Sequence, residues 1–118
     1  MAFDIVKGRR VLIERVMEAM AGYIRDSVPE SGSFKGPWLV LRYPGTEHEG
    51  RLYSQYSQQH GCALRASVVV EGTDVEISHY VFFGSKDDCI AWLEDSAHRD
   101  ELIESYNELT ERADNYEI

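Results

Sequence analysis

Carboxylate side chains recur at helical spacing near the C-terminal end of the chain. Asp100, Glu104, Glu108 and Glu111 are separated by four, four and three residues, so an α-helix would place all four on one face. Like charges at this spacing cost an isolated helix about 0.2–0.5 kcal/mol per pair. Electrostatic docking to a basic partner would use such an acidic stripe, because complementary charge raises the association rate and discriminates among partners. An ordinary solvated helix face has the same pattern.

A second set of residues combines aromatic and arginine side chains at alternating positions in the middle of the chain. Aromatic residues and arginine are enriched at the hot spots of protein interfaces. Tyr53, Tyr80 and Arg51 are the candidate contacts, and they share one expected sheet face with Trp38, Arg42, Arg65 and Phe82. That face could bind a partner, a second copy of the chain or a small ligand. Alternatively, one of the helices covers it.

A metal or nucleophile site has little support in the sequence. His48, His60 and Cys62 are the nearest approach to a cluster, but zinc needs three or four ligands in a defined geometry and no paired cysteine spacing is present. Cys62 is most simply a small buried residue. The sequence also has no glycine-rich phosphate loop and no nucleophile elbow. We therefore expect no metal, no cofactor and no catalytic residue.

Acidic charge is concentrated at the C-terminal end. Residues 85–118 carry eleven of the twenty-one acidic side chains and three of the twelve basic ones, a net charge of −8 out of −9 for the chain. Direct binding to nucleic acid depends on lysine and arginine displacing counterions from phosphates, so this charge argues against it. It favours a basic partner, or serves solubility alone.

Length and composition indicate one domain. The 118 residues, 43% of them hydrophobic, suffice for a single core, and we expect residues 1–118 to form one α+β domain. No run of about 18 apolar residues suggests a membrane span. The N-terminus lacks a signal-peptide layout and two cysteines are too few for a disulfide framework, so we expect a reduced, cytoplasmic protein.

Hydrophobic periodicity predicts the elements. Apolar residues at three- and four-residue spacing indicate a helix over 9–27, with Asp4 as N-cap if it starts earlier, followed by a connector at 30–33. From residue 37 to 83 the period changes to two and predicts four strands with short connections, an antiparallel meander. One bent helix or two separate helices are expected from 86 to about 114, with Ser85 as N-cap and a break or bend near 96–98.

Strand parity predicts which side chains face the core. The third strand should turn Leu64, Ala66, Val68 and Val70 inward, and the fourth should turn Val75, Ile77, Val81 and Phe83 inward, leaving Tyr80 and Phe82 outside. The expected core comprises Leu39, Leu41, Val68, Ile77, Ile90, Leu93, Leu102, Tyr106 and Leu109. The helices should pack on one sheet face, because a sheet has to bury its apolar side.

These expectations converge on a binding function. A small acidic α+β domain with an exposed carboxylate stripe suits a non-catalytic inhibitor of the immunity or antitoxin type, which covers the active site or nucleic-acid surface of a basic toxin such as a nuclease. An anti-defence inhibitor of a nuclease is a close variant. A homo-oligomeric or small-ligand-binding module that uses the sheet face, and a secretion chaperone, are the alternatives from other classes.

Overall fold

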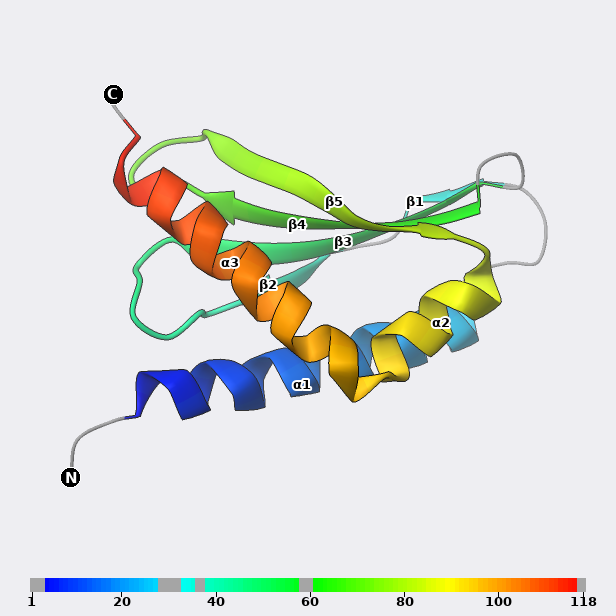
Figure 1. Ribbon diagram of the computed structural model, residues 1–118. Coiled ribbons are helices and arrows are strands. Elements are labelled where there is room, and N and C mark those ends of the chain that lie inside the picture. Colours follow the sequence, from blue (N-terminus) through cyan, green and yellow to red (C-terminus); the bar gives the residue numbers. More distant parts are fainter. Residues whose placement is uncertain (1–3, 28–32, 36–37, 58–60, 117–118) are drawn as a thin grey trace.

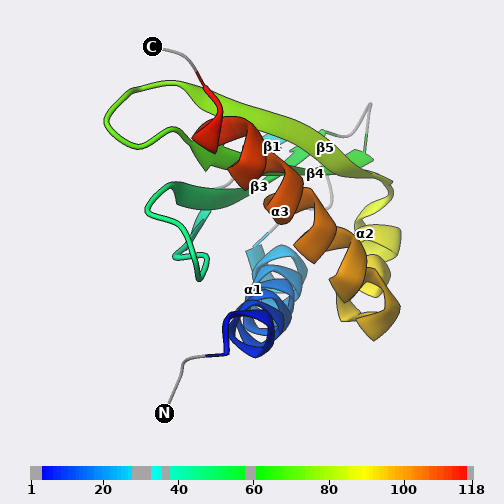
Figure 2. The same ribbon diagram turned by 60° about the vertical axis from the view of Figure 1, so that its left-hand side comes forward.

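The computed structural model describes residues 4–27, 33–35, 38–57 and 61–116. Their order is α1 (Ile5–Ser27), β1 (Ser33–Lys35), β2 (Leu39–Leu41), β3 (Glu49–Ser57), β4 (Gly61–Val69), β5 (Glu76–Gly84), α2 (Lys86–Glu94), a 3₁₀ turn η1 (Ser96–His98) and α3 (Arg99–Asp114). Helices α1, α2 and α3 lie on one side of an antiparallel sheet, and within these described ranges no helix lies over the other side (Figures 1 and 2). The α+β fold predicted from the sequence is confirmed.

Helix α1 begins earlier than residue 9, because Asp4 caps it. The Asp4 carboxylate accepts a hydrogen bond from the Lys7 backbone N–H (3.1 Å), and the Asp4 carbonyl accepts one from Gly8 N–H (2.9 Å). Its buried stripe has the three- and four-residue spacing from which the helix was predicted, and it comprises Ile13, Val16, Met17, Met20, Ala21 and Ile24. This stripe is the surface that α1 turns to the core.

The sheet order is β1-β3-β4-β5, and β2 also pairs with β3. The predicted four-strand meander corresponds to β2 through β5. The expected connector at 30–33 is partly wrong, since Ser33 begins the additional strand β1; residues 30–32 lie outside the described part of the chain. Strands β1 and β2 both pair with the same edge of β3, β1 along residues 55–57 and β2 along 50–52. This edge of the sheet is therefore formed by two short strands in succession.

A β-bulge in β5 corrects the predicted parity of that strand. Leu64 pairs with Phe82 whereas the next residue, Arg65, pairs with Tyr80, so Val81 is the extra residue on the bulged strand. Every side chain after the bulge changes face. The prediction for the two phenylalanines was wrong: Phe82 lies on the helix side, with its ring centroid 5.8 Å from that of Trp92, and Phe83 is 66% exposed on the other side.

The break predicted within the C-terminal helical segment is confirmed at η1. Ser85 caps α2 by accepting a hydrogen bond from Asp88 N–H (3.0 Å), and Asp95 caps η1 by accepting one from Ala97 N–H (2.9 Å). Six of the nine expected core residues are fully buried, namely Leu41, Val68, Leu93, Leu102, Tyr106 and Leu109. The other three, Leu39, Ile77 and Ile90, are partly exposed and pack against this core.

Hydrogen bonds from two tyrosines fix the helices onto the sheet. Tyr106 of α3 is fully buried and its hydroxyl donates to the backbone carbonyl of Arg51 in β3 (2.6 Å). The Tyr43 hydroxyl, in the loop after β2, donates to the Asn107 side chain of α3. Arg9 of α1 donates to Asn107 (3.1 Å) and to the Pro44 carbonyl (2.8 Å). The position of α3 is thus set by polar contacts as well as by apolar packing.

Cys62 of β4 and Cys89 of α2 are both buried free thiols. They are hydrogen-bonded to each other, which lowers the pKa of Cys62 and, together with burial, raises the pKa of Cys89.

The described helices include none with the length and apolar character that a membrane span requires.

Replacing Leu109 with alanine tests the docking of α3. Leu109 has no exposed surface, so Leu109→Ala should lower the free energy of unfolding by about 2–5 kcal/mol, measured by urea denaturation. Glu108→Ala, one residue earlier on the exposed side, is the matched control and should change it by less than about 0.5 kcal/mol. A loss equally small for Leu109→Ala would mean that α3 is not packed on the sheet.

Alkylation tests the burial of the thiols. Iodoacetamide should modify neither Cys62 nor Cys89 in the folded protein at neutral pH, because the reagent cannot reach them. Both should react after unfolding in urea, as measured by intact mass. Rapid modification of the native protein, or an unreduced mass that shows a bridge between the two residues, would contradict this prediction.

Candidate binding surfaces

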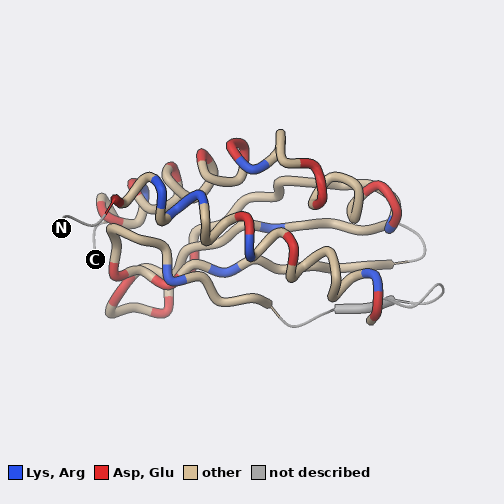
Figure 3. Tube along the Cα trace, turned by 90° about the horizontal axis from the view of Figure 1, so that it is seen from below, with Lys and Arg blue, Asp and Glu red and all other residues tan. Residues whose placement is uncertain are grey.

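The acidic stripe lies on the exposed side of α3. Asp100, Glu104, Glu108 and Glu111 are all exposed, while the opposite side of the helix buries Leu102, Tyr106, Leu109, Thr110 and Ala113. Helix α3 carries six acidic and two basic side chains in all, and acidic positions recur along its length (Figure 3). The predicted clustering of the four carboxylates on one exposed face follows from this geometry.

The carboxylates of the stripe are largely unpaired. Asp100 has a guanidinium at 3.7 Å, from Arg99, which also pairs with Glu14 of α1. Among the described residues, no basic side chain forms an ion pair with Glu104, Glu108 or Glu111. Three negative charges on a docked helix are therefore exposed to solvent with no ion-pair partner among the described residues.

Aromatic and arginine side chains form a row across the helix-free face of the sheet, which we call the aromatic–arginine row. It consists of Trp38, Tyr53, Arg65 and Tyr80, one residue from each of four adjacent segments. Trp38, directly before β2, has its ring centroid 5.4 Å from that of Tyr53 in β3. The Arg65 guanidinium in β4 lies 4.1 Å from the Tyr53 ring centroid, and Arg65 pairs in register with Tyr80 of β5. The row spans the sheet from one edge to the other.

A polar network adjoins this row and holds it in place. The Tyr53 hydroxyl donates to the Glu76 carboxylate (2.6 Å) and accepts from Arg51 (3.1 Å). Arg51 also pairs with Glu49 (2.7 Å), and its guanidinium lies 4.9 Å from the Trp38 ring centroid. Ser67 donates a further hydrogen bond to Glu76. The Tyr53 ring is therefore in contact with Trp38 and Arg65, and its hydroxyl is hydrogen-bonded to Glu76 and Arg51.

The network shifts the ionisation of its members. Burial alone would raise the pKa of the Glu76 carboxyl, but hydrogen bonds from Ser67 and Tyr53 outweigh it and the pKa is lowered. The guanidinium groups of Arg51 and Arg65 add to this lowering. The pKa of Tyr53 is raised, first by burial and then by its hydrogen bond to Glu76. Hydrogen bonds to Tyr53 and Glu49 raise the pKa of Arg51.

Exposure differs along the row, which corrects one expectation. Tyr53 was expected to be an exposed contact, but it is only 8% exposed because Trp38 and Arg65 cover its ring. Trp38 and Tyr80, at the two ends, are 46% and 47% exposed. The alternative that a helix covers this face is wrong, since α1, α2 and α3 lie on the opposite side (Figure 2). Only the ends of the row offer large accessible ring surface.

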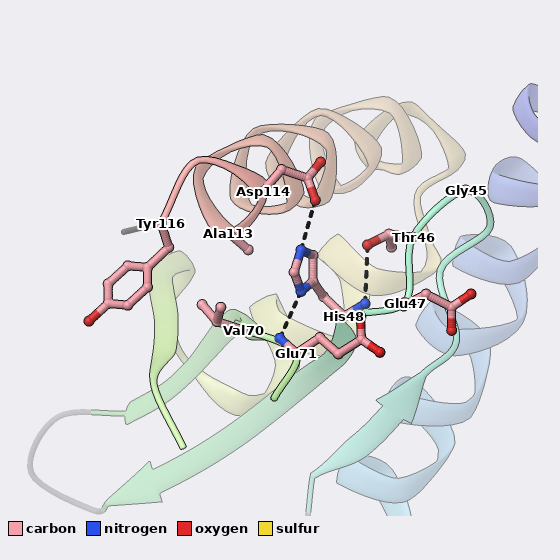
Figure 4. A pocket seen from close by; sticks show the side chains of 9 residues that line it. All are labelled: Gly45, Thr46, Glu47, His48, Val70, Glu71, Ala113, Asp114 and Tyr116. Carbon is pink, nitrogen blue, oxygen red and sulfur yellow. Dashed lines mark hydrogen bonds and ion pairs between the residues drawn. The ribbon is translucent and has the colours of Figure 1, made fainter. Parts of the chain in front are cut away.

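A hollow of about 520 Å³ lies between the loop after β2, the β4–β5 turn and the end of α3 (Figure 4). At its centre, His48 Nδ1 accepts a hydrogen bond from Glu71 N–H (2.8 Å) and Nε2 lies 2.7 Å from the Asp114 carboxylate. The neutral ring must therefore carry its proton on Nε2. Both ring nitrogens are engaged, so His48 joins three segments and presents no free base to the hollow.

The sequence did not indicate the partners of His48, because Glu71 and Asp114 are 23 and 66 residues away and only the fold brings them together. Within the described residues no group of three or more His, Cys, Asp or Glu side chains is placed to hold a metal ion. Of the cluster considered from the sequence, His60 lies outside the described residues, and Cys62 is buried against Cys89.

The residues predicted to bind a partner therefore fall on two opposite surfaces. Asp100, Glu104, Glu108 and Glu111 lie on the outer side of the helical layer, whereas Arg51, Tyr53 and Tyr80 lie on the helix-free sheet face. No protein-family model, curated protein or solved structure matches the chain. The chemistry of the two surfaces is therefore what a functional assignment has to explain.

Replacing Glu76 with glutamine tests the polar network through its pH dependence. Folding lowers the pKa of Glu76, so its carboxylate stabilises the folded protein at pH values above about 4.3, the pKa of glutamate in an unfolded chain. This stabilisation is lost as the pH falls through the lower pKa of the folded state. Glu76→Gln should therefore cost about 1–2 kcal/mol at pH 7, and the difference from wild type should shrink below about pH 4.3.

Urea denaturation at a series of pH values measures this difference. Tyr53→Phe, which removes only the hydroxyl bonded to Glu76, is the matched control and should remove part of the same pH dependence. A Glu76→Gln effect that stays constant from neutral to acid pH would show that the carboxylate charge is not stabilised by the network.

Proposed function

We propose that the chain is a non-catalytic inhibitor of the immunity or antitoxin type, which neutralises a basic protein by docking the acidic stripe of α3 onto it. The observation that carries the proposal is the set of exposed carboxylates of Glu104, Glu108 and Glu111, which have no ion-pair partner among the described residues. A basic partner would supply the missing charges.

The packing of α3 supports a docking role for the stripe. A binding surface gains affinity when it is already ordered, because less conformational entropy is lost on association. Helix α3 is held by the buried Tyr106 and by the contacts of Asn107 with Arg9 and Tyr43. The carboxylates are therefore carried on a fixed backbone, and their repulsion is a local cost that packing of the opposite side offsets.

Two hollows lie beside the stripe and could receive side chains of a partner. A second hollow of about 520 Å³ is lined by Ile77, Glu108, Glu111, Arg112, Asn115 and Tyr116, so two carboxylates and one guanidinium face it. Tyr116 also lines the hollow at His48, where the carboxylates of Glu47, Glu71 and Asp114 add further negative charge. Lysine or arginine side chains of a partner could enter these hollows and contact both carboxylate and ring.

A nuclease toxin is the partner class that fits this surface best. Enzymes that act on nucleic acids need a basic surface to hold phosphates, and an acidic inhibitor competes for that same surface. Fast, electrostatically steered association suits a protein that must intercept a toxin before it reaches its substrate. We place this action in the reducing cytoplasm of the cell that makes the chain, consistent with its two free thiols.

Charge reversal on the stripe tests this proposal. The partner is first recovered from the native host with the wild-type chain as bait. Glu104→Lys/Glu108→Lys should then slow association with it about 10-fold or more at low salt, because the attraction felt before contact is removed. The wild-type association rate should fall as salt is added. Stopped-flow or surface binding kinetics measure both effects.

Glu18→Lys/Asp26→Lys is the matched control, since it reverses two exposed carboxylates on α1 and changes the net charge equally. It should slow association much less, and both double variants should keep the wild-type unfolding free energy to within about 0.5 kcal/mol. Equal rates for the stripe variant and the wild type would show that α3 is not the docking surface. Equal slowing by both variants would show that only the total charge matters.

A further inference from the structure

The helix-free face of the sheet exposes more large apolar surface than any other part of the described chain. Trp38 and Val40 are exposed at its β2 edge, and Tyr80 and Phe83 at its β5 edge. The Tyr80 and Phe83 ring centroids are 4.8 Å apart, so these two side chains form one apolar margin. Exposed apolar patches of this kind on a soluble domain mark interaction sites. The acidic stripe lies on the opposite side and does not use them.

Charge restricts what can cover this face. Two copies of a chain with net charge −9 repel each other, and most strongly where their acidic helices approach. On the helix-free face, however, the guanidinium groups of Arg51 and Arg65 are balanced by the carboxylates of Glu49 and Glu76. The sheet face is therefore a place where a second copy can approach without facing the acidic surface.

When the aromatic–arginine rows of two copies run in opposite directions, unlike residues of the row face each other. Read from β2 to β5 the row is Trp38, Tyr53, Arg65, Tyr80, and read backwards it places an aromatic ring opposite each arginine. A two-fold axis parallel to the strands brings the two rows together in opposite directions, with Trp38 over Tyr80 at both ends and the two Arg65 side chains offset from each other. An axis parallel to the row would place Arg65 on its own copy and is disfavoured by like charge.

We propose that a second copy of this chain docks on the helix-free sheet face, as a two-fold symmetric dimer whose axis runs parallel to the strands and which pairs Trp38 of each copy with Tyr80 of the other. Aligned packing of two sheets about 10 Å apart is a common way to bury such faces. The dimer leaves both α3 helices on its outer sides. This inference is independent of the proposed inhibitor function.

The size of the face indicates a weak, reversible dimer. Four strands about 4.8 Å apart, with up to nine residues rising about 3.3 Å each, give a footprint of roughly 19 × 30 Å per copy. The two footprints together, roughly 1,100 Å², lie near the lower limit of specific interfaces. Dissociation constants in the micromolar range are expected for such a contact.

Sedimentation velocity over about 10–500 µM protein tests the dimer. The wild type should shift from monomer to dimer within this range, and Trp38→Ala/Tyr80→Ala should remain monomeric. Val11→Ala/Tyr116→Ala, which truncates two exposed apolar side chains away from the sheet face, is the matched control and should dimerise like the wild type. A monomeric wild type at every concentration, or a dimer that survives Trp38→Ala/Tyr80→Ala, would overturn the proposal.

Mixing two single variants tests the direction of the axis. With the axis parallel to the strands, a dimer of Trp38→Ala alone or of Tyr80→Ala alone keeps no intact pair between positions 38 and 80, whereas a dimer with one copy of each keeps one such pair. The equimolar mixture should therefore dimerise more strongly than either variant alone, as measured by sedimentation velocity. With the axis along the row, each single variant would keep one pair of like residues and the mixed dimer none, so weaker dimerisation of the mixture would overturn the assigned axis.

The two proposals fail separately. Glu104→Lys/Glu108→Lys alters the helical layer and should leave the dimer unchanged, which sedimentation of that variant measures. Trp38→Ala/Tyr80→Ala alters only the sheet face, and at concentrations well below the dimer dissociation constant it should associate with a basic partner at the wild-type rate. Loss of the dimer by the stripe variant would contradict the assigned face.

Discussion

The apolar side of β3 and β4 has to be removed from water, and α1, α2 and α3 together remove it. Leu52 and Leu64 have no exposed surface, and the fully buried Ile13, Met20 and Leu102 of the helices belong to the same core. Because α1, α2 and α3 all lie on this side, no helix of the described residues remains to cover the other side of the sheet. The chain therefore has an acidic helix, α3, in its helical layer and an aromatic sheet face on the opposite side.

Periodicity in the sequence was sufficient for the helices and for β2 to β5, but it missed β1 and was insufficient for the details of the sheet. The buried stripe of α1, the caps at Asp4 and Ser85, and the break at 96–98 all follow from local spacing and residue type. The bulge at Val81 could not be predicted, because one extra residue in a strand leaves no mark in its composition. The exchange of Phe82 and Phe83 between the faces follows from that single residue.

The two candidate surfaces also differed in how far the sequence could predict them. The stripe of α3 depends only on spacing within one helix, so the sequence located it. The aromatic–arginine row depends on the pairing of β3 with β4 and of β4 with β5, which sets Tyr53, Arg65 and Tyr80 side by side. Sequence parity could place these residues on one face but could not show that Tyr53 is covered by its neighbours. Likewise, the contact of His48 with Asp114 required the tertiary fold.

The two surfaces are compatible with each other because the core separates them. Pairing of two copies through their sheet faces would place the acidic helices on the outside, where their mutual repulsion is weakest and where both stay accessible. The field of such a dimer has twice the charge of one chain, which strengthens long-range attraction of a cationic partner even before contact. The sheet face can then contribute to binding without touching the partner, by setting how many acidic stripes one assembly presents and in which directions they point.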